Sequence, residues 1–260
     1  MAAVPATVLT DPYCPWSWAA EPQLRRLQVE FGDSVAITFV IVGLHRRIEP
    51  ADAAALALAT VDAAAESAMP ADPRVFLRDP PSSTHPAGLA MTAVAEQAHP
   101  GPYLRRLREA IFLERRRMDT AAALLDAARE TGGLDLDRLR VAFASNAIVE
   151  RFGEDVERGR GVTTPAIRFG AGPLVEGYGP YERMRAAALA AGAVASGDGP
   201  PGVEHALRRF GALATPEVAA ACDGRAGANV RVSAELWRLA LEWRVRPRPV
   251  TGGELWEAVA

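Results

Sequence analysis

The chain has 260 residues, of which 49% are hydrophobic, and a formal net charge of -3. This length and apolar content suffice for one or two domains with full cores. The small negative charge argues against a general affinity for nucleic acids or anionic membranes. The first six residues carry neither a basic nor an apolar segment, and no apolar run approaches the roughly 20 residues that span a bilayer. We therefore expect a cytoplasmic protein without a signal peptide, a membrane partner or a nucleic-acid partner.

The first 42 residues predict a strand, a helix and a second strand. Residues 6–10 are an apolar run typical of a short buried strand. Residues 15–31 repeat apolar side chains at helical spacing, and Pro22 should kink that helix. Residues 35–42 are rich in β-branched side chains and predict a second strand. Two strands joined through a helix are expected to be parallel.

Cys14 lies directly before the predicted helix. Unsatisfied backbone N–H groups and the helix dipole favour the thiolate there, which is the nucleophilic form. The position three residues later, where a dithiol motif has its second cysteine, is Ser17. We expect the Ser17 hydroxyl to donate a hydrogen bond to the sulfur, and we predict these two residues as the catalytic pair. Cys222 is remote in sequence and is expected to pack in a core.

The spacing of apolar residues divides the rest of the chain into helical and β segments. Residues 50–158 are almost wholly helical in pattern, apart from a proline-rich loop at 70–86, and a β-hairpin and a helix follow. Residues 193–202 are the best linker candidate. The expected domains are an α/β domain (1–49 and 159–192), a helical insertion (50–158), the linker and a C-terminal subdomain (203–260).

The sequence of the C-terminal subdomain predicts three helices followed by a β-hairpin, which is the order of elements in a winged-helix domain. Its third helix is expected to begin at Ser233 and to place Leu236, Leu239 and Trp243 on one face. Residues 203–260 hold eight arginines against seven acidic residues. Phosphate contacts need a clear positive surplus, so we do not expect this subdomain to bind DNA.

Three local motifs resemble the DsbA-like branch of the thioredoxin fold over residues 6–192. Residues 11–22 (DPYCPWSWAAEP) are similar to the D-P-x-C-x-W-C-W…E-P opening of its cytoplasmic members. Residues 161–165 (GVTTP) resemble its G-V-x-x-[TV]-P segment, and residues 83–87 (STHPA) its S-T-x-P-A loop. The resemblance implies an α/β, thioredoxin-like fold, here with a large all-helical insertion and a winged-helix-like appendage.

The resemblance also implies the site. Cys14 is the expected nucleophile, and Pro165 is expected to follow a cis peptide bond. That bond would bring the Thr164 backbone beside the sulfur, free to pair with an extended peptide or a thiol ligand. A histidine at position 85 would favour the thiolate or bind an anionic group. The expected substrate-binding residues are Tyr13, Pro15, Trp16, Thr84, His85, Thr164 and Pro165.

Three functions are compatible with these residues. Ser17 cannot resolve a mixed disulfide, so the first is thiol–disulfide exchange through Cys14 alone. Its partner would be a protein client or a low-molecular-weight thiol of the glutathione, mycothiol or bacillithiol type. The second is a non-catalytic adaptor, since some cytoplasmic relatives hold a client for a protease. The third is a glutathione-type transferase or isomerase, because kappa-class transferases and 2-hydroxychromene-2-carboxylate isomerases have S-P-Y-S-W where residues 14–18 read CPWSW. We expect no metal and no tightly bound cofactor.

Overall fold

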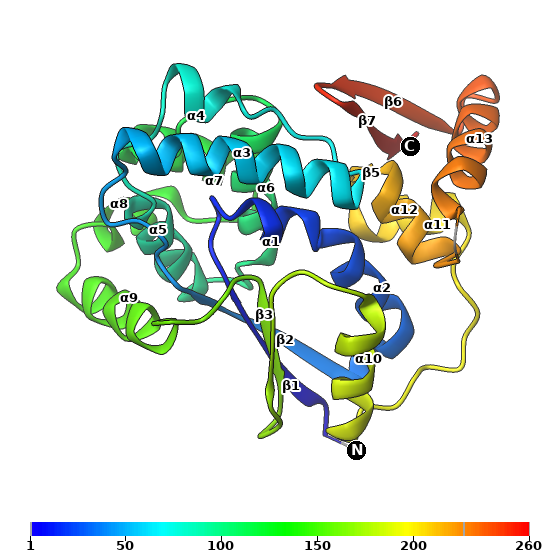
Figure 1. Ribbon diagram of the computed structural model, residues 1–260, viewed down its shortest axis with the longest axis horizontal. Coiled ribbons are helices and arrows are strands. Elements are labelled where there is room, and N and C mark those ends of the chain that lie inside the picture. The colour runs from blue at the N-terminus through cyan, green and yellow to red at the C-terminus, as the bar shows by residue number, and fades with distance from the viewer. Residues whose placement is uncertain (1, 226, 260) are drawn as a thin grey trace.

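A four-stranded sheet lies at the centre of the molecule (Figure 1). The computed structural model describes residues 2–225 and 227–259. The strand order is β2-β1-β3-β4, and β1 is parallel to β2, as predicted, and antiparallel to β3. β3 and β4 form the predicted hairpin. The strands span Val4–Thr10 (β1), Val35–Ile41 (β2), Ala166–Phe169 (β3) and Leu174–Glu176 (β4).

The predicted first helix is interrupted, close to where Pro22 was expected to kink it. α1 spans Pro15–Ala19 and α2 spans Glu21–Phe31. A continuous helix needs the N–H of residue 22 to bond to the carbonyl four residues earlier, and proline has no N–H. Pro22 instead lies in the first turn of α2, where that N–H is not required. A short 3-10 helix, η1 (Gly32–Ser34), leads into β2.

α2 and α10 (Tyr181–Ala190) pack on one face of the sheet. Their apolar side chains meet those of β1 and β3 in a compact core, because alternate residues of each strand point to the same face. This core includes Val8, Leu27, Phe31, Ile167, Phe169 and Met184. Residues 11–14 connect the end of β1 to the start of α1.

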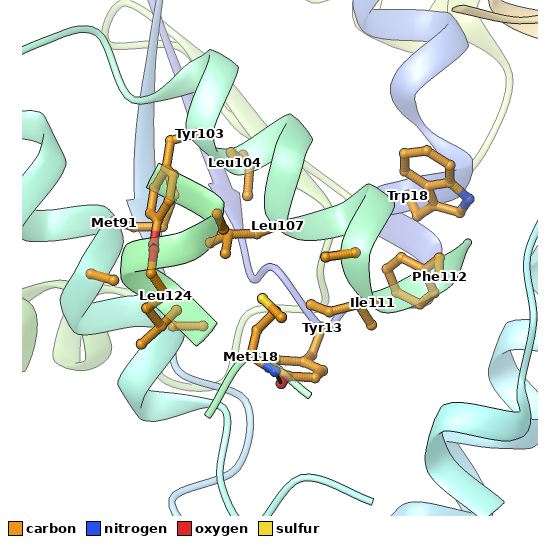
Figure 2. Close-up of a cluster of buried hydrophobic side chains, with 14 of the residues drawn as sticks. Tyr13, Trp18, Met91, Tyr103, Leu104, Leu107, Ile111, Phe112, Met118 and Leu124 are labelled. Carbon is orange, nitrogen blue, oxygen red and sulfur yellow. Dashed lines mark hydrogen bonds between the residues drawn. The ribbon is translucent and has the colours of Figure 1, made fainter. Parts of the chain in front are cut away.

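The helical insertion forms the largest core of the protein. Figure 2 shows Tyr13 and Trp18, from the segment around Cys14, among its side chains. Residues 70–86 were predicted as a loop, but α4 lies within them, because Val75 and Phe76 are buried in this core. The helices span Pro50–Ser67 (α3), Arg74–Arg78 (α4), His85–Ala95 (α5), Gly101–Phe112 (α6), Ala121–Thr131 (α7), Leu136–Ala142 (α8) and Asn146–Arg158 (α9).

The C-terminal part has a core and a sheet of its own. Its three strands are ordered β5-β7-β6, and its core includes Leu213, Val218, Val232, Leu236 and Trp256. Residues 193–202 form neither helix nor strand. The expected domain limits and the winged-helix likeness stay predictions. The elements span Val203–Phe210 (α11), Leu213–Ala214 (β5), Thr215–Cys222 (α12), Ala228–Leu241 (α13), Val245–Val250 (β6) and Gly253–Ala258 (β7).

Two predictions about α13 were wrong. It begins at Ala228, so Ser233 lies inside it and not at its start. Ala228 and Val232 are buried against the C-terminal core, and this packing extends the helix toward its N-terminus. Trp243 lies beyond the helix, at a positive φ of 60°, and is 85% exposed. It therefore does not share the buried face of Leu236 and Leu239.

A buried set of ion pairs joins α2, α6 and α12. Glu217 of α12 is fully buried and accepts two hydrogen bonds from Arg105 of α6, at 2.7 and 2.9 Å. The same guanidinium lies 4.7 Å from the centre of the Trp18 ring. Glu21, the first residue of α2, pairs with buried Arg108. The C-terminal part is therefore anchored to α2 and α6 by buried ion pairs. Within the described residues, no helix is long and apolar enough to cross a membrane.

Candidate thiol site

Cys14 is the residue that caps the N-terminus of α1. Its backbone N–H donates to the Asp11 carbonyl at 3.1 Å, which closes a turn at the end of β1. Its sulfur accepts a hydrogen bond from the backbone N–H of Ser17 at 3.3 Å. A thiolate is stabilised by such a donor. Cys14 is 3% exposed, so neighbouring residues cover nearly all of its side chain.

Thr164 supplies the second polar contact to the sulfur. Its Oγ1 lies 3.2 Å from Cys14 Sγ. The Thr164–Pro165 peptide bond is cis, and both residues are partly exposed. A thiolate has no proton, so the Thr164 hydroxyl would act as the donor to it. Within residues 2–225 and 227–259, the backbone N–H and C=O of Thr164 make no hydrogen bond.

An aromatic pair forms one wall beside this segment. The rings of Trp16 and Tyr178 lie 5.6 Å apart and are inclined by 35°. Tyr178 belongs to the loop after β4, which is tied to α2 because Gln23 Nε2 donates to the Gly179 carbonyl at 2.6 Å. The Gly177 N–H donates to the Thr163 carbonyl at 3.2 Å, which ties the same loop to the Thr164 segment. Trp16 was expected here, whereas Tyr178 was missed.

Ser17 does not act as predicted. Its backbone N–H, and not its hydroxyl, contacts the sulfur. The side chain is 2% exposed, and its Oγ is buried without a hydrogen-bond partner among the described residues. It lines a narrow cavity of about 30 Å³ together with Gln23, Arg108 and Pro165. A space of this size is large enough for one water molecule.

Tyr13 was expected to bind substrate, and its position corrects that expectation. It is fully buried, and its ring packs edge-on against Phe76 at 6.3 Å. Its hydroxyl accepts a hydrogen bond from the Met118 N–H at 2.7 Å, and Figure 2 shows the two residues together in the helical core. Tyr13 thus anchors the Cys14 turn to the insertion. Pro15 is likewise buried, at the first position of α1.

Thr84 is also fully buried, so it positions the site and does not line it. Its Oγ1 donates to Asp11 Oδ2 at 3.3 Å and accepts from the His45 N–H at 3.1 Å. Asp11 also accepts hydrogen bonds from the Tyr13 and Leu44 N–H groups, at 2.8 and 3.0 Å. Burial raises the pKa of Asp11 to about 6. This carboxyl ties the end of β1 to two loops, and sequence reasoning missed its role although it opens the DPYC motif.

His85 was expected to face the thiol, and the structure corrects this too. Its ring packs edge-on against Phe152 at 5.2 Å, close to Gly43. Burial lowers the pKa of His85, so the ring is largely neutral at pH 7. The polar contacts of the Cys14 sulfur come instead from Ser17 and Thr164. His85 therefore places no positive charge on the thiolate.

Cys222 lies at the end of α12 and packs against the C-terminal core, as expected. Both cysteines are free. Burial, with the charges of Glu235 and Asp223, raises the pKa of Cys222 to about 12. A thiol with so high a pKa attacks disulfides slowly. No group of three or more His, Cys, Asp or Glu side chains in the described part of the chain is arranged to hold a metal ion.

Comparisons with known proteins relate the chain to thioredoxin-fold proteins. A family model described as thioredoxin matches residues 8–163. The ClpXP adapter protein SpxH of Halalkalibacterium halodurans is 27% identical over 95% of this chain and 86% of its own length. A putative protein disulfide isomerase from Nitrosomonas europaea has a TM-score of 0.62 at 19% identity, covering 72% of this chain and 97% of that one. The cytosolic disulfide reductase DsbM of Pseudomonas aeruginosa has a TM-score of 0.55 at 20% identity, covering 66% of this chain and 87% of that one.

The family match spans more than half of the chain and begins within β1, before the Cys14 turn. The two solved structures share the fold over about two thirds or more of this chain. The chain therefore belongs to the thioredoxin family and has the DsbA-like form of its fold.

Proposed function

We propose that the protein exchanges thiols and disulfides through Cys14 alone. The observation that carries this is the placement of the sulfur between the Ser17 N–H, which donates to it, and the Thr164 hydroxyl, which can donate to a thiolate. Both donors stabilise the thiolate that attacks a disulfide. Ser17 occupies the place of a resolving cysteine, and Cys222, with its raised pKa, is a poor substitute.

The exchange takes place in two steps. The Cys14 thiolate attacks one sulfur of a partner disulfide, so that the partner's S–S bond breaks, a Cys14–partner S–S bond forms, and the other partner sulfur leaves as a thiolate. An external thiolate then attacks the partner sulfur of this mixed disulfide. Cys14 is released as a thiolate, and the partner leaves in a new disulfide. No electrons are gained or lost by the protein over the cycle.

The part of the partner that enters the site should be narrow, like an extended peptide segment. Cys14 is 3% exposed, whereas the neighbouring Thr164 is partly exposed and its backbone N–H and C=O have no protein partner among the described residues. An extended peptide or a γ-glutamyl-cysteine type of thiol can pair with these two groups, as a strand does at a sheet edge. The Trp16–Tyr178 pair then forms one wall of the binding region.

We place this activity in the cytoplasm. A single reactive thiol without a resolving partner needs a pool of small thiols to release it, and reducing compartments supply one. The disulfide reductase DsbM, which shares the fold, is described as cytosolic.

Mass spectrometry tests the proposal. The reduced protein is incubated with oxidised glutathione, and the intact mass and peptide map are recorded. We expect one glutathione on Cys14, its release by added thiol, and no adduct in Cys14→Ser. Cys222→Ser is the matched control and should still form the adduct. Equal labelling of Cys14 and Cys222, or no labelling of Cys14, would contradict the proposal.

A second candidate is a client-binding adaptor. It is favoured by the relative named as a ClpXP adapter, which this chain matches over 95% of its length. Such a role needs a binding surface and not a reactive sulfur. It predicts that Cys14→Ala retains binding to the ClpX protein or the client of the same organism in a pull-down with purified components, whereas the exchange proposal predicts that the same variant loses every mixed disulfide.

A further inference from the structure

Two buried polar atoms face one cavity beside the thiol site, and neither has a hydrogen-bond partner in the part of the chain that the structure describes. They are Ser17 Oγ of α1 and Arg108 Nε of α6. Both residues line the cavity of about 30 Å³ that Pro165 also lines, and they are only 2% and 1% exposed. Buried polar atoms almost always have a protein or water partner, because leaving one without a partner costs free energy. Two such atoms on one cavity therefore indicate a polar occupant.

The Arg108 guanidinium is fixed on its other side, so its Nε–H cannot turn to another partner. Nη1 donates to the Glu21 carboxylate and Nη2 donates to the Thr10 hydroxyl, and all three residues are buried. Burial opposes the ionised form of Glu21, but the charges of Arg25, Arg108 and Arg105 outweigh it and lower the pKa of Glu21. The carboxylate therefore stays ionised at neutral pH and holds the guanidinium in place.

The size and the chemistry of the cavity favour a water molecule as its occupant. A space of about 30 Å³ accommodates one water. Arg108 Nε can only donate a hydrogen bond, whereas the Ser17 hydroxyl can donate or accept one, and a water molecule can pair with both. A small anion is disfavoured, because Arg108 is already paired with Glu21 and the rest of the lining is mainly apolar. Pro180 and Arg183 are exposed and line the same cavity, so water can reach it from the surface.

We propose that one water molecule bridges Arg108 Nε and Ser17 Oγ, and that Arg108 thereby acts as a positioning residue for the thiol site. The contacts continue through residue 17 itself, since the Ser17 N–H donates to Cys14 Sγ at 3.3 Å. Residue 17 is held by its side chain in the cavity and by its backbone at the sulfur. The bridge keeps this N–H directed at the sulfur and so favours the thiolate. Its effect on reactivity rests on the proposed use of Cys14, whereas the presence of the water does not.

Solution NMR of the ¹⁵N-labelled protein tests the water directly. The Nε–H signal of Arg108 is assigned as the one that is missing from Arg108→Lys. A rotating-frame Overhauser experiment then records which protons lie close to it. We expect a dipolar cross-peak at the water frequency, because a water molecule buried between two partners stays bound long enough to be observed. An Arg108 Nε–H signal without such a cross-peak would overturn the proposal.

Two substitutions of Ser17 distinguish the water from the hydroxyl proton. Ser17→Val fills the cavity, so the cross-peak should disappear. Ser17→Ala removes the hydroxyl but leaves the space, so a weaker cross-peak should remain from water held by Arg108. Thr163→Val is the matched control outside the cavity and should keep the full cross-peak. Circular dichroism checks that each variant is folded. A cross-peak that is unchanged in Ser17→Val, or that is lost as completely in Ser17→Ala, would refute the bridge.

The pH profile of Cys14 alkylation by iodoacetamide tests the positioning role, in a Cys222→Ser background that leaves one thiol. Ser17→Val should slow alkylation at pH 7 by about threefold, because the hydrogen bond to the thiolate is weakened. It should leave the rate near pH 10 almost unchanged, since the thiol is then ionised in every variant. The titratable groups nearby, Asp11, His45 and His85, are common to all variants and do not affect the comparison.

The positioning role and the exchange reaction fail in different ways. Loss of the NMR cross-peak in Ser17→Val with an unchanged pH profile would refute the positioning role. Alkylation by iodoacetamide needs no disulfide partner, so a failure of the exchange reaction would appear in the glutathione experiment and not in this profile.

Discussion

The hydroxyl of Thr164 lies 3.2 Å from the sulfur of Cys14, although 150 residues separate the two in the chain. The pairing of β1 with β3 makes this contact, since Cys14 follows the end of one strand and Thr164 precedes the start of the other. The helical insertion lies between them in sequence but is accommodated outside the sheet (Figure 1). The site is therefore set by the sheet, and its reactivity depends on a residue far from the cysteine motif.

Thr164→Val should slow the reaction of Cys14 with iodoacetamide at pH 7 by about threefold to tenfold. The hydroxyl that is lost can donate to the thiolate, and a hydrogen bond to a charged group contributes about 1.5 kcal/mol or more, which corresponds to a factor of about ten. Part of this loss is offset because a sulfur with one hydrogen-bond donor fewer is a better nucleophile. The control is Thr163→Val, which removes a neighbouring hydroxyl with no contact to the sulfur among the described hydrogen bonds. Equal rates for the two variants would refute the role of Thr164.

Ser17→Cys should turn the single-thiol site into a dithiol site. Residue 17 lies one helical turn from Cys14, and its N–H already contacts the sulfur at 3.3 Å. Under mild oxidation we expect an internal disulfide between positions 14 and 17, detected as a mass loss of two hydrogens with no intermolecular adduct. Adducts with glutathione should then be short-lived, because the new thiol resolves them.

Ser17→Ala is the matched control for that variant, and it should keep the stable adduct on Cys14. The hydroxyl that it removes has no hydrogen-bond partner in the described part of the chain. A stable glutathione adduct on Cys14 in Ser17→Cys would show that the two positions cannot react with each other.

The family fold was predictable because its signals are local. A cysteine before a helix, a proline that interrupts that helix and the strand–helix–strand order all lie within the first 42 residues. α4 was missed because a five-residue helix between prolines depends on burial of Val75 and Phe76, which only the tertiary structure supplies. The early start of α13 was missed for the same reason.

The candidate site was predictable only in part. Cys14 and Thr164 follow from motifs, and the structure places them in contact. Tyr13 and His85 were assigned by proximity to those motifs, but adjacent residues of a turn or helix point in different directions, and these two side chains are held by the core. Tyr178 was missed because it contacts Trp16 of α1, which lies 162 positions away in the chain, and its one local signal is the surrounding Gly-Tyr-Gly-Pro turn.

Asp11 should make the protein less stable as the pH rises from 4 to 7. Its pKa is raised from 3.8 to about 6 in the folded state, chiefly by burial. A raised carboxyl pKa means that the folded state binds the proton more tightly than the unfolded state. Asp11 therefore contributes its full stabilisation of the folded state, about 3 kcal/mol, below about pH 4. This contribution is lost as the pH rises past 6.

Urea unfolding of Asp11→Asn and of the unmodified chain at several pH values measures this effect. The variant lacks the titrating group, so its free energy of unfolding should rise relative to the unmodified chain between pH 4 and pH 7. Asp119→Asn is the control, because hydrogen bonds from Arg117 and Ser82 hold the pKa of Asp119 below its usual value. The stabilisation from Asp119 is lost only as the pH falls below about 4, so this variant should show almost no change relative to the unmodified chain between pH 4 and pH 7. A pH-independent difference for Asp11→Asn would contradict the assignment.

Glu217→Gln should destabilise the protein by about 3 kcal/mol, because it leaves buried Arg105 without its bidentate partner. Arg105 also lies against the Trp18 ring, so tryptophan fluorescence should change together with the loss of stability. The matched control is Glu257→Gln, which breaks a largely exposed pair with Arg246 and should cost less than about 1 kcal/mol. Equal unfolding midpoints in urea for the two variants would mean that the junction between α6 and α12 is not held by this ion pair, and that the C-terminal part is attached to the rest mainly through apolar contacts.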